Sequence, residues 1–334
     1  MTKTIAIVTP VLDDWASFAE LMTEISDRFT GSDVVFHICA VDDGSVAPFD
    51  AADIVLPAVS CVASIEIIRL AANLGHQRAI AIGLCAIADS SEIDAAVVMD
   101  SDGQDRPVDI SALLAASARH PGYVVFAGRA QRPESRVFRL WYCVYKLLFY
   151  VLTGQAIDFG NYCLMPVAAV RRLVHMPELW NNLAASVMRS RLSYMSVPTV
   201  RGSRCAGRSR MNLVALMVHG LSALSVYTDK IFVRVLLAAG LVAGLAGLGI
   251  VGVAAIRLST DLAIPGWATI AIGDLLIILL QILVIVIAAS LTVLAGRSNR
   301  PIVPIVDCPC FVAARQHYRL DRRSAAAAAV RPAA

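Results

Sequence analysis

Carboxylates gather directly after an apolar segment in "VVMDSDGQDRP", residues 97–107, where Asp100 and Asp102 are separated by one serine. In an extended chain alternate residues face the same side, so these two side chains would lie together. Neighbouring carboxylates repel each other unless a cation is shared between them. Oxygen ligands suit a hard divalent ion. The spacing therefore favours Mg²⁺ or Mn²⁺ held by Asp100 and Asp102 together with a diphosphate.

Two further polar clusters follow apolar runs: Pro10–Asp14 and Asp42-Asp43-Gly44-Ser45. A single acidic pair is also typical of a solvated loop, but three clusters at predicted strand ends indicate a nucleotide-sugar site. Asp105 precedes a predicted helix, and we expect it to cap that helix.

The elements that must position these clusters alternate between two patterns. Short β-branched runs predict strands, and amphipathic stretches predict helices between them. This alternation predicts an α/β domain with a mostly parallel sheet covered on both faces, whose ligands bind at the carboxyl ends of the strands. The predicted strands are 4–9, 34–41, 65–70, 95–99 and 123–127, and the predicted helices are 14–29, 76–89 and 107–119.

The composition points to a membrane. The chain has 334 residues, of which 57% are hydrophobic, and its mean hydropathy is +0.67. Residues 235–256 and 267–294 are apolar runs long enough to cross a bilayer. The first apolar run is too short for a signal peptide and is followed by a proline, so the N-terminal part is expected to stay in the cytosol. Basic residues flank the two spans on one side: Lys230, Arg234, Arg297 and Arg300.

This charge asymmetry predicts a multi-pass protein of the inner (cytoplasmic) membrane with both termini in the cytoplasm. Residues 139–152 are aromatic and apolar but too short to span, so they form either an interfacial helix or a buried one. The end of the chain is alanine-rich, and we expect its last dozen residues to be disordered. The expected organisation is a cytosolic domain (1–210), a juxtamembrane interfacial helix (211–230), a two-helix transmembrane hairpin (231–296) and a cytosolic tail (297–334).

Two patterns invite other readings. The eight cysteines lie in apolar segments, and we interpret them as reduced core residues. Gly247-x-Gly249-x-x-Gly252 matches a dinucleotide-binding motif, but it lies inside an unbroken apolar run. Such glycines favour close helix packing, which predicts a homo-oligomer formed through the first span.

At this point a family resemblance becomes visible. "VTPVLDD", "VDDGS", "RLAANLGHQRAIAIGL" and "VVMDSDGQDRP" resemble, in this order, the motifs of family-2 glycosyltransferases with the GT-A (Rossmann-like) fold. Order and spacing resemble the branch of polyprenyl-phosphate glycosyltransferases and dolichyl-phosphate mannose synthase. The resemblance implies inverting transfer of a sugar from a nucleotide-diphosphate sugar to polyprenyl (undecaprenyl) phosphate on the cytoplasmic leaflet, in cell-envelope synthesis. We expect no nucleic-acid partner.

The resemblance also implies roles for individual residues. Asp100 and Asp102 would hold the metal, Asp102 would also be catalytic, and Arg129 would lie near the active site. His76 is either a nucleotide contact or a helix cap. The residues implied in donor binding are Pro10, Asp14, Asp42, Asp43, Asn73, Gly75, Asp100 and Gln104.

The basic stretch 204–210 resembles the family's "R-x-x-G-x-S-K" loop. The resemblance implies that Arg204, Arg208, Ser209 and Arg210 bind the acceptor phosphate. The alternative is a basic juxtamembrane segment attracted to anionic lipid.

"IDFGNYCLMP" resembles the family's "D-x-G-D-F-R-L-M" segment and places Asp158 at an acidic position linked to catalysis or acceptor positioning. Asn161 and Cys163 stand where an aspartate and an arginine are usual, which leaves the acceptor open. A phosphate acceptor needs no base, whereas a lipid or glycan hydroxyl would need one, and Asp158 is then the candidate. A catalytically inactive membrane protein that binds nucleotide sugars is the third interpretation.

Overall fold

The computed structural model divides the chain into two compact units, each described here by itself. It describes residues 2–51, 54, 60–129, 136–156, 159–204, 213–259, 266–319 and 331–332. The first unit comprises Met1–Tyr145, Ala156–Val226 and Ile302–Ala334, and the second comprises Lys146–Gln155 and Tyr227–Pro301.

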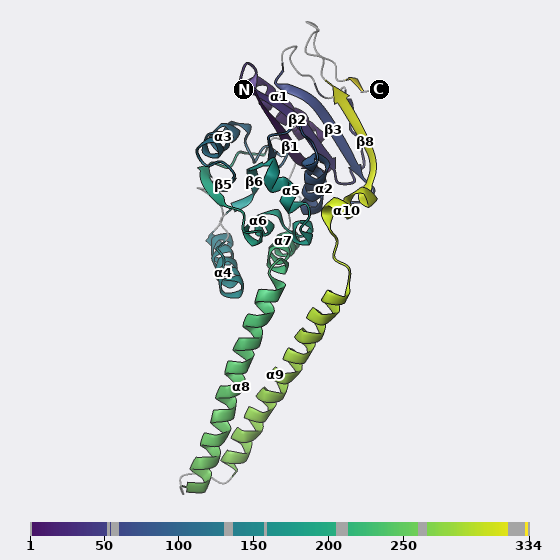
Figure 1. The fold of residues 1–334 in the computed structure, drawn as a ribbon. Coiled ribbons are helices and arrows are strands. Elements are labelled where there is room, and N and C mark those ends of the chain that lie inside the picture. The colour runs from purple at the N-terminus through teal and green to yellow at the C-terminus, as the bar shows by residue number, and fades with distance from the viewer. Residues whose placement is uncertain are drawn as a thin grey trace. The chain divides into compact units, whose positions relative to one another are not determined.

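A mixed, mostly parallel sheet forms the centre of the first unit (Figure 1). Within the described residues it has nine strands in the order β7-β5-β6-β4-β1-β2-β3-β8-β9. Strand β1 pairs in parallel with β2 and β4, while β6 runs antiparallel to β4 and β5. The strands are β1 (Lys3–Val11), β2 (Val34–Asp42), β3 (Val62–Leu70), β4 (Ala95–Val98), β5 (Val124–Arg129), β6 (Phe159–Pro166), β7 (Tyr194–Thr199), β8 (Val312–Arg319) and β9 (Arg331–Pro332).

Helices cover both faces of this sheet, because side chains alternate along the buried strands. Ile5 and Ile7 of β1 pack in one apolar cluster with α1 and α3, whereas Ala6 and Val8 pack in the other with α2, α5 and α6. The helices are α1 (Trp15–Phe29), α2 (His76–Ala88), α3 (Ile110–Arg119), α5 (Val167–Leu173) and α6 (Leu183–Arg189), with short 3₁₀ turns η2 (Pro107–Asp109) and η3 (Pro177–Trp180). The predicted α/β architecture with its first five strands is therefore confirmed.

The C-terminal segment returns to the sheet, which the sequence did not lead us to predict. After α10 (Pro304–Asp307) and η4 (Cys308–Phe311), strand β8 pairs antiparallel with β3. The Cys308 Sγ lies 3.4 Å from the Sγ of Cys85 on α2. Tyr318 is 9% exposed, and its ring centroid lies 5.5 Å from that of Phe49. Part of the tail therefore belongs structurally to the first unit, and β8 covers the edge of β3.

The cysteine interpretation holds only in part. Cys39, Cys61, Cys163 and Cys308 are buried thiols, but Cys143 and Cys310 are exposed. For those two, the expectation of core residues is wrong, since both sit on surfaces that the fold leaves uncovered. Cys205 lies outside the described residues.

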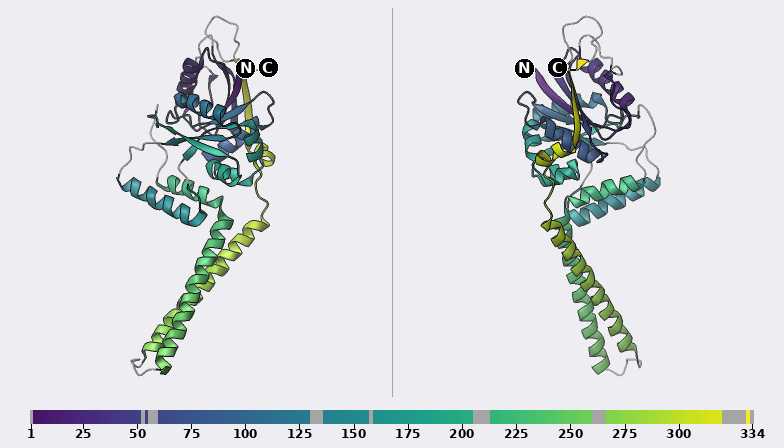
Figure 2. Two further views of the ribbon diagram at one scale, coloured as in Figure 1. Left: turned by 60° about the vertical axis from the view of Figure 1, so that its left-hand side comes forward. Right: turned by 90° about the vertical axis from the view of Figure 1, so that its right-hand side faces the viewer.

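Helix α7 (Leu213–Ser225) lies beside the part of α4 (Arg136–Thr153) that belongs to the first unit (Figure 2). The Tyr145 hydroxyl donates to the Gly220 carbonyl at 3.3 Å. The buried alternative for 139–152 is wrong for much of α4, because Leu147 is 65% exposed and Leu148 and Val151 are also exposed. An apolar surface of this kind is typical of a helix that meets lipid.

The second unit contains two long apolar helices that run side by side, α8 (Thr228–Ser259) and α9 (Trp267–Ser298) (Figure 1). Their most apolar windows have mean hydropathies of 2.3 and 3.0, and both helices are long and apolar enough to cross a membrane. The glycine motif lies in the middle of α8, so it has no strand before it. A Cβ on Gly249 would lie 3.2 Å from Leu275 of α9, which fits close helix packing.

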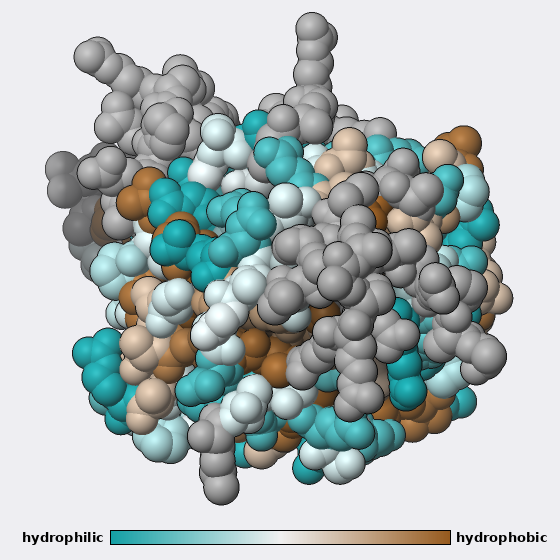
Figure 3. Space-filling view, turned by 90° about the horizontal axis from the view of Figure 1, so that it is seen from above, coloured by the Kyte–Doolittle hydropathy of each residue, from teal (hydrophilic) through white to brown (hydrophobic). Residues whose placement is uncertain are grey.

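The first unit has a different surface. Seen from the side on which Figure 1 marks the N-terminus, its visible described residues are largely hydrophilic or intermediate, with scattered apolar groups (Figure 3). Scattered apolar residues of this kind are normal for a water-exposed surface. Long stretches of exposed apolar residues lie in the helices of the second unit.

If β8 is part of the folded domain, Tyr318→Ala will destabilise it. We expect a loss of about 3–5 kcal/mol, because the ring is buried against Phe49 and truncating buried aromatic residues costs this much. His317→Ala is the matched control, since its side chain is 58% exposed. Thermal unfolding of both variants in detergent measures the difference, and equal stabilities would contradict a packed β8.

Candidate active site

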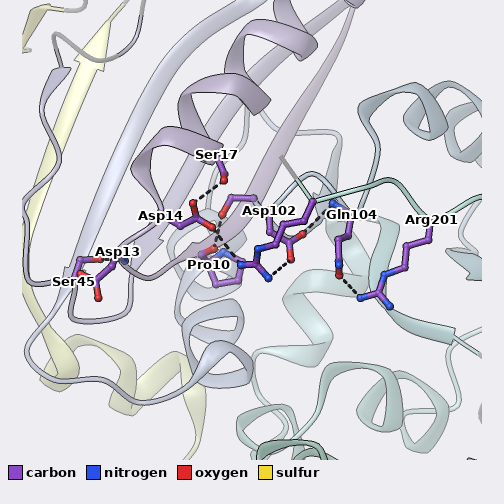
Figure 4. A network of polar contacts seen from close by, with 10 residues as sticks. Pro10, Asp13, Asp14, Ser17, Ser45, Asp102, Gln104 and Arg201 are labelled. Carbon is purple, nitrogen blue, oxygen red and sulfur yellow. Dashed lines mark hydrogen bonds and ion pairs between the residues drawn. The ribbon is translucent and has the colours of Figure 1, made fainter. Parts of the chain in front are cut away.

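The loops after β1 and β2 are tied to each other at the carboxyl edge of the sheet (Figure 4). The Asp13 N–H donates to the Ser45 hydroxyl at 2.8 Å, and the Val46 N–H donates to the Asp13 Oδ1 at 2.6 Å. Asp13 has a φ of 47°, a left-handed conformation that aspartate tolerates better than most residues. This turn directs Asp14 toward the centre of the site.

Asp42 and Asp43 are both buried, and both use their oxygens inside the protein. Asp42 accepts from the Ser45 N–H at 2.8 Å, and its other oxygen lies 3.7 Å from Arg69. Asp43 accepts from the N–H groups of Leu74 and Gly75 at 2.7 and 2.9 Å. Burial raises the pKa of Asp43, and these two amide hydrogen bonds oppose the rise. Asp43 therefore holds the loop that precedes α2.

Glycine is required where these loops approach. Gly44 has a φ of 83°, and a Cβ there would lie 2.9 Å from the Asn73 nitrogen. Gly75 has a φ of 92° and is the residue before α2, so His76 begins the helix and does not cap it. Asn73 is exposed at the surface of this loop. Residues 73–75 of the motif therefore lie beside Asp43 and Gly44.

The Asp100–Asp105 segment is a turn, so the extended geometry expected for Asp100 and Asp102 is wrong. The turn is closed by the Asp100 N–H, which donates to the Asp105 Oδ2 at 3.0 Å. Asp105 therefore does not cap the next helix, where Arg106 is the N-cap and no side chain caps it. The Ser101 hydroxyl donates to the Pro10 carbonyl at 3.3 Å, which ties the turn to β1.

Arg204 joins two of the predicted site residues. Its guanidinium lies 3.4 Å from the Asp14 Oδ2 and 3.4 Å from the Asp102 Oδ2, and all three side chains are about one-fifth to one-quarter exposed. Asp14 also accepts from the Ser17 hydroxyl at 2.6 Å, and Asp102 accepts from the Gln104 N–H at 3.0 Å. The structure thus brings together residues from positions 14, 102 and 204.

Arg201 is a site residue that the sequence interpretation missed. Its guanidinium donates to the Gln104 side-chain oxygen (Figure 4), and the Gly202 N–H donates to the Gln104 carbonyl at 2.9 Å. Gln104 therefore holds the segment after β7, and with Tyr162 and Arg201 it lines a small pocket. The cluster of basic residues from 201 onward was the available signal.

The electrostatics of Asp102 suit a divalent cation. Burial raises the pKa of Asp102, and the neighbouring Asp100 carboxylate raises it further; the Gln104 amide, Arg204 and Arg201 oppose the rise. Within the described ranges no group of three or more His, Cys, Asp or Glu side chains could hold a metal. Two carboxylates still fit Mg²⁺ or Mn²⁺, because such ions complete their coordination with water and phosphate oxygens.

Several predicted residues are not placed. Arg129 ends β5, where its backbone is in register with Thr199, but its side chain is not among those described. Asp158, Arg208, Ser209 and Arg210 lie outside the described residues.

The two departures at 161 and 163 have different surroundings. Cys163 is fully buried in the β6 strand beside Val98 of β4, and burial raises the pKa of its thiol. Asn161 instead accepts a hydrogen bond from the side chain of Gln77 at 3.0 Å. Cys163 is therefore a core residue, and Asn161 belongs to a polar network.

Sequence comparison identifies the family to which the chain belongs. The profile of glycosyl transferase family 2 matches residues 6–175, which is 170 of the 334 residues. The chain belongs to this family and is a glycosyltransferase of the GT-A fold that takes its sugar from a nucleotide sugar.

Among individual proteins, the chain is similar to the uncharacterized glycosyltransferase YkcC of Bacillus subtilis (strain 168), with 25% identity over 278 residues that cover 81% of this chain and 83% of YkcC. It is also similar to glucosyl-3-phosphoglycerate synthase from Mycobacterium tuberculosis. The crystal structure of that enzyme with Mn²⁺, UDP-glucose and phosphoglyceric acid has a TM-score of 0.48 at 16% identity, covering 69% of this chain and 80% of that one. Its complex with Mg²⁺ and UDP has a TM-score of 0.47 at 15% identity, covering 68% and 79%. These similarities are too low to carry a substrate or metal over to this chain.

Gly202→Ala is expected to lower the rate of sugar transfer by roughly 10- to 100-fold, as small displacements of positioned groups do. A Cβ at this position would collide with the Gly103 carbonyl oxygen and push Arg201 and Arg204 away from the Asp102 turn. Ser203→Ala, in the same segment but at an exposed position, is the control. Release of nucleoside diphosphate from a nucleotide sugar measures both, and a fully active Gly202→Ala enzyme would contradict the packed arrangement.

Proposed function

We propose that the protein is a membrane-anchored, inverting glycosyltransferase that moves a sugar from a nucleotide-diphosphate sugar to polyprenyl phosphate on the cytoplasmic leaflet. The observation that carries the proposal is the position of Arg204 between Asp14 and Asp102. It places a cation beside the predicted diphosphate site, in the basic segment that precedes the apolar helices. The two long helices supply the expected route to a lipid acceptor.

The charges of the two substrates define the task of the site. The second pKa of a phosphate monoester is about 6, so a lipid phosphate is largely a dianion at neutral pH. It is already a nucleophile and needs no general base. One of its oxygens attacks the anomeric carbon in line, the bond from that carbon to the diphosphate breaks, and nucleoside diphosphate leaves. The attack inverts the configuration at that carbon.

Bringing a dianion to an anionic donor requires cations on both sides. Asp100 and Asp102 are proposed to hold Mg²⁺ or Mn²⁺, whose contribution when bound is to neutralise the charge that develops on the leaving diphosphate. Arg204 is proposed to screen the acceptor phosphate, together with Arg208, Ser209 and Arg210. Arginine suits this role because its planar guanidinium contacts two phosphate oxygens at once. Asp14 and the Asp43-held loop at 73–75 are proposed to line the nucleotide pocket, together with Pro10 and Asp42.

A second acceptor class has its own support. Asn161 stands where the family usually has an aspartate, which favours acceptor contacts other than those of the polyprenyl-phosphate branch. A lipid or glycan hydroxyl would require removal of its proton during attack, and Asp158 is then the proposed base.

The membrane placement is also a proposal. Lys230 and Arg234 lie in the first two turns of α8, Arg297 lies at the end of α9 and Arg300 follows it. All four are on one side of the two apolar runs, which favours cytoplasmic termini and an inner-membrane hairpin. The exposed apolar residues of α4 favour contact with the lipid surface. A homo-oligomer through α8 is compatible with Gly240 and Gly244, near which an added Cβ would meet no described atom within 4 Å.

The first test uses purified full-length protein in detergent with Mg²⁺ or Mn²⁺, undecaprenyl phosphate and a panel of nucleotide sugars. We expect a lipid-linked sugar by mass spectrometry, and its formation should fall at least 100-fold in Asp102→Asn, since one charged ligand is lost. Asp27→Asn, on the exposed side of α1, is the control. Nucleotide-sugar binding without any lipid product would rule out the phosphate acceptor.

Asp158→Asn separates the two acceptor classes. With a phosphate acceptor the loss of transfer rate should stay below about tenfold, because no proton has to be removed from the nucleophile. A hydroxyl acceptor predicts a loss of about 10²- to 10⁴-fold, the usual contribution of a general base. Initial rates at saturating donor are the measurement, with Asp102→Asn assayed in parallel as the inactive reference.

A further inference from the structure

Gln77, the second residue of α2, has a buried side-chain amide. Its hydrogen-bond partners show which end of the amide is oxygen and which is nitrogen. Gln77 is 7% exposed. Its Oε1 accepts from the backbone N–H of Leu183 at 2.9 Å. Its Nε2 lies 3.0 Å from the Asn161 Oδ1 and 3.0 Å from the His76 Nε2. Because a backbone N–H can only donate, Leu183 determines which end of the Gln77 side chain is oxygen.

The orientation of the Gln77 amide determines the protonation state and the tautomer of His76. The Gln77 Nε2 carries two protons and no acceptor lone pair. One proton is donated to Asn161, and the other points at the His76 Nε2, which must then accept. An imidazolium has protons on both nitrogens and cannot accept, so His76 is neutral and its ring proton is on Nδ1.

Two further features favour a neutral ring. Burial lowers the pKa of His76, because a charged ring is poorly solvated there. His76 is also the first residue of the 13-residue helix α2, and the positive end of a helix dipole disfavours a cation.

Several described charged groups on α2 and on the elements packed around it have partners other than His76. Asp43 accepts from Leu74 and Gly75, and the Arg78 guanidinium lies over the Trp180 ring at 5.7 Å. Glu178 pairs with Arg189 at 2.8 Å. Four more described charged groups on these elements bond to other partners: Asp42 to Ser45, Arg171 to Ala88 and Ser90, Arg172 to Ser190, and Asp307 to Val303.

We propose that Gln77 is a positioning residue that fixes His76 as the neutral Nδ1–H tautomer, and that this N–H donates a hydrogen bond to an acceptor oxygen of the nucleotide sugar. The contact between His76 and the nucleotide sugar rests on the proposed function, because that function places residues 73–76 in the nucleotide pocket. Asn161 has a defined part in this arrangement. Its amide oxygen accepts one Gln77 proton without adding a charge beside the ring.

Nitrogen NMR of the full chain in detergent, with ¹⁵N-labelled histidine, tests the tautomer without donor. The His76 signals are assigned by their loss in His76→Gln. We expect a protonated Nδ1 and an unprotonated Nε2 at pH 7, and titration below the ordinary histidine pKa of 6.5. A protonated Nε2 at pH 7 would overturn the proposal.

Two isosteric variants test whether Gln77 sets the His76 tautomer. In Gln77→Glu the carboxylate cannot donate to His76, and in Asn161→Asp a negative charge is added next to Gln77. Gln77→Glu should therefore move a proton onto the His76 Nε2, whereas Asn161→Asp keeps the Gln77 donor in place and should leave Nε2 unprotonated at pH 7. His37, whose Nδ1 lies 2.7 Å from the Ser64 hydroxyl on the adjacent strand β3, is the internal control and should not change. An unchanged His76 tautomer in Gln77→Glu would show that Gln77 does not set it.

The contact between His76 and the nucleotide sugar is tested on the same sample by adding Mg²⁺ with UDP-glucose or GDP-mannose. Binding is measured separately by calorimetry. Binding should shift the His76 Nδ1–H signal, and His76→Gln should weaken binding about tenfold, as expected for one hydrogen bond. Nucleotide-sugar binding without that shift would overturn the donor contact. If none of the nucleotide sugars binds, the proposed function fails, while the tautomer result stands on its own.

Discussion

Carboxylates buried at the ends of parallel strands need cations or amide donors to remain charged, because desolvation otherwise favours the protonated form. The carboxyl edge of this sheet is organised by that need. Asp43 accepts hydrogen bonds from two backbone amides of the loop before α2. Asp102 accepts a hydrogen bond from the Gln104 amide and pairs with Arg204. Asp105 accepts a hydrogen bond from the Asp100 amide. Each carboxylate thereby fixes a loop, so the arrangement of the loops follows from where the acids are placed.

The same need explains why the site draws on distant parts of the sequence. Arg204 lies next to Asp14 and Asp102 only because β7 ends at the same edge as β1 and β4, and because Gly202 allows close approach of the two backbones. Family membership makes the chain a glycosyltransferase. Its residues at 161 and 163 have separate surroundings, since Cys163 fills the core and Asn161 accepts a hydrogen bond from Gln77.

The first unit is completed by residues that follow both apolar helices in the sequence. Strand β8 pairs with β3 and packs Tyr318 against Phe49. An uncovered strand edge is a hazard for aggregation, so this return protects β3. It also means that the ends of the helical hairpin are connected on both sides to the same folded domain.

The sequence by itself determined the α/β pattern, the first five strands, the two apolar helices and the family, because local periodicity and short motifs carry that information. It also located the acidic clusters at strand ends. Only the tertiary structure decided what each acid touches: Asp43 holds a loop, Asp105 closes a turn, and Asp102 faces Arg204. Strand β8, Arg201 and the Gln77 network likewise depend on contacts between residues far apart in the chain. Such contacts leave no local pattern, since they arise from packing and from the pairing of buried polar groups.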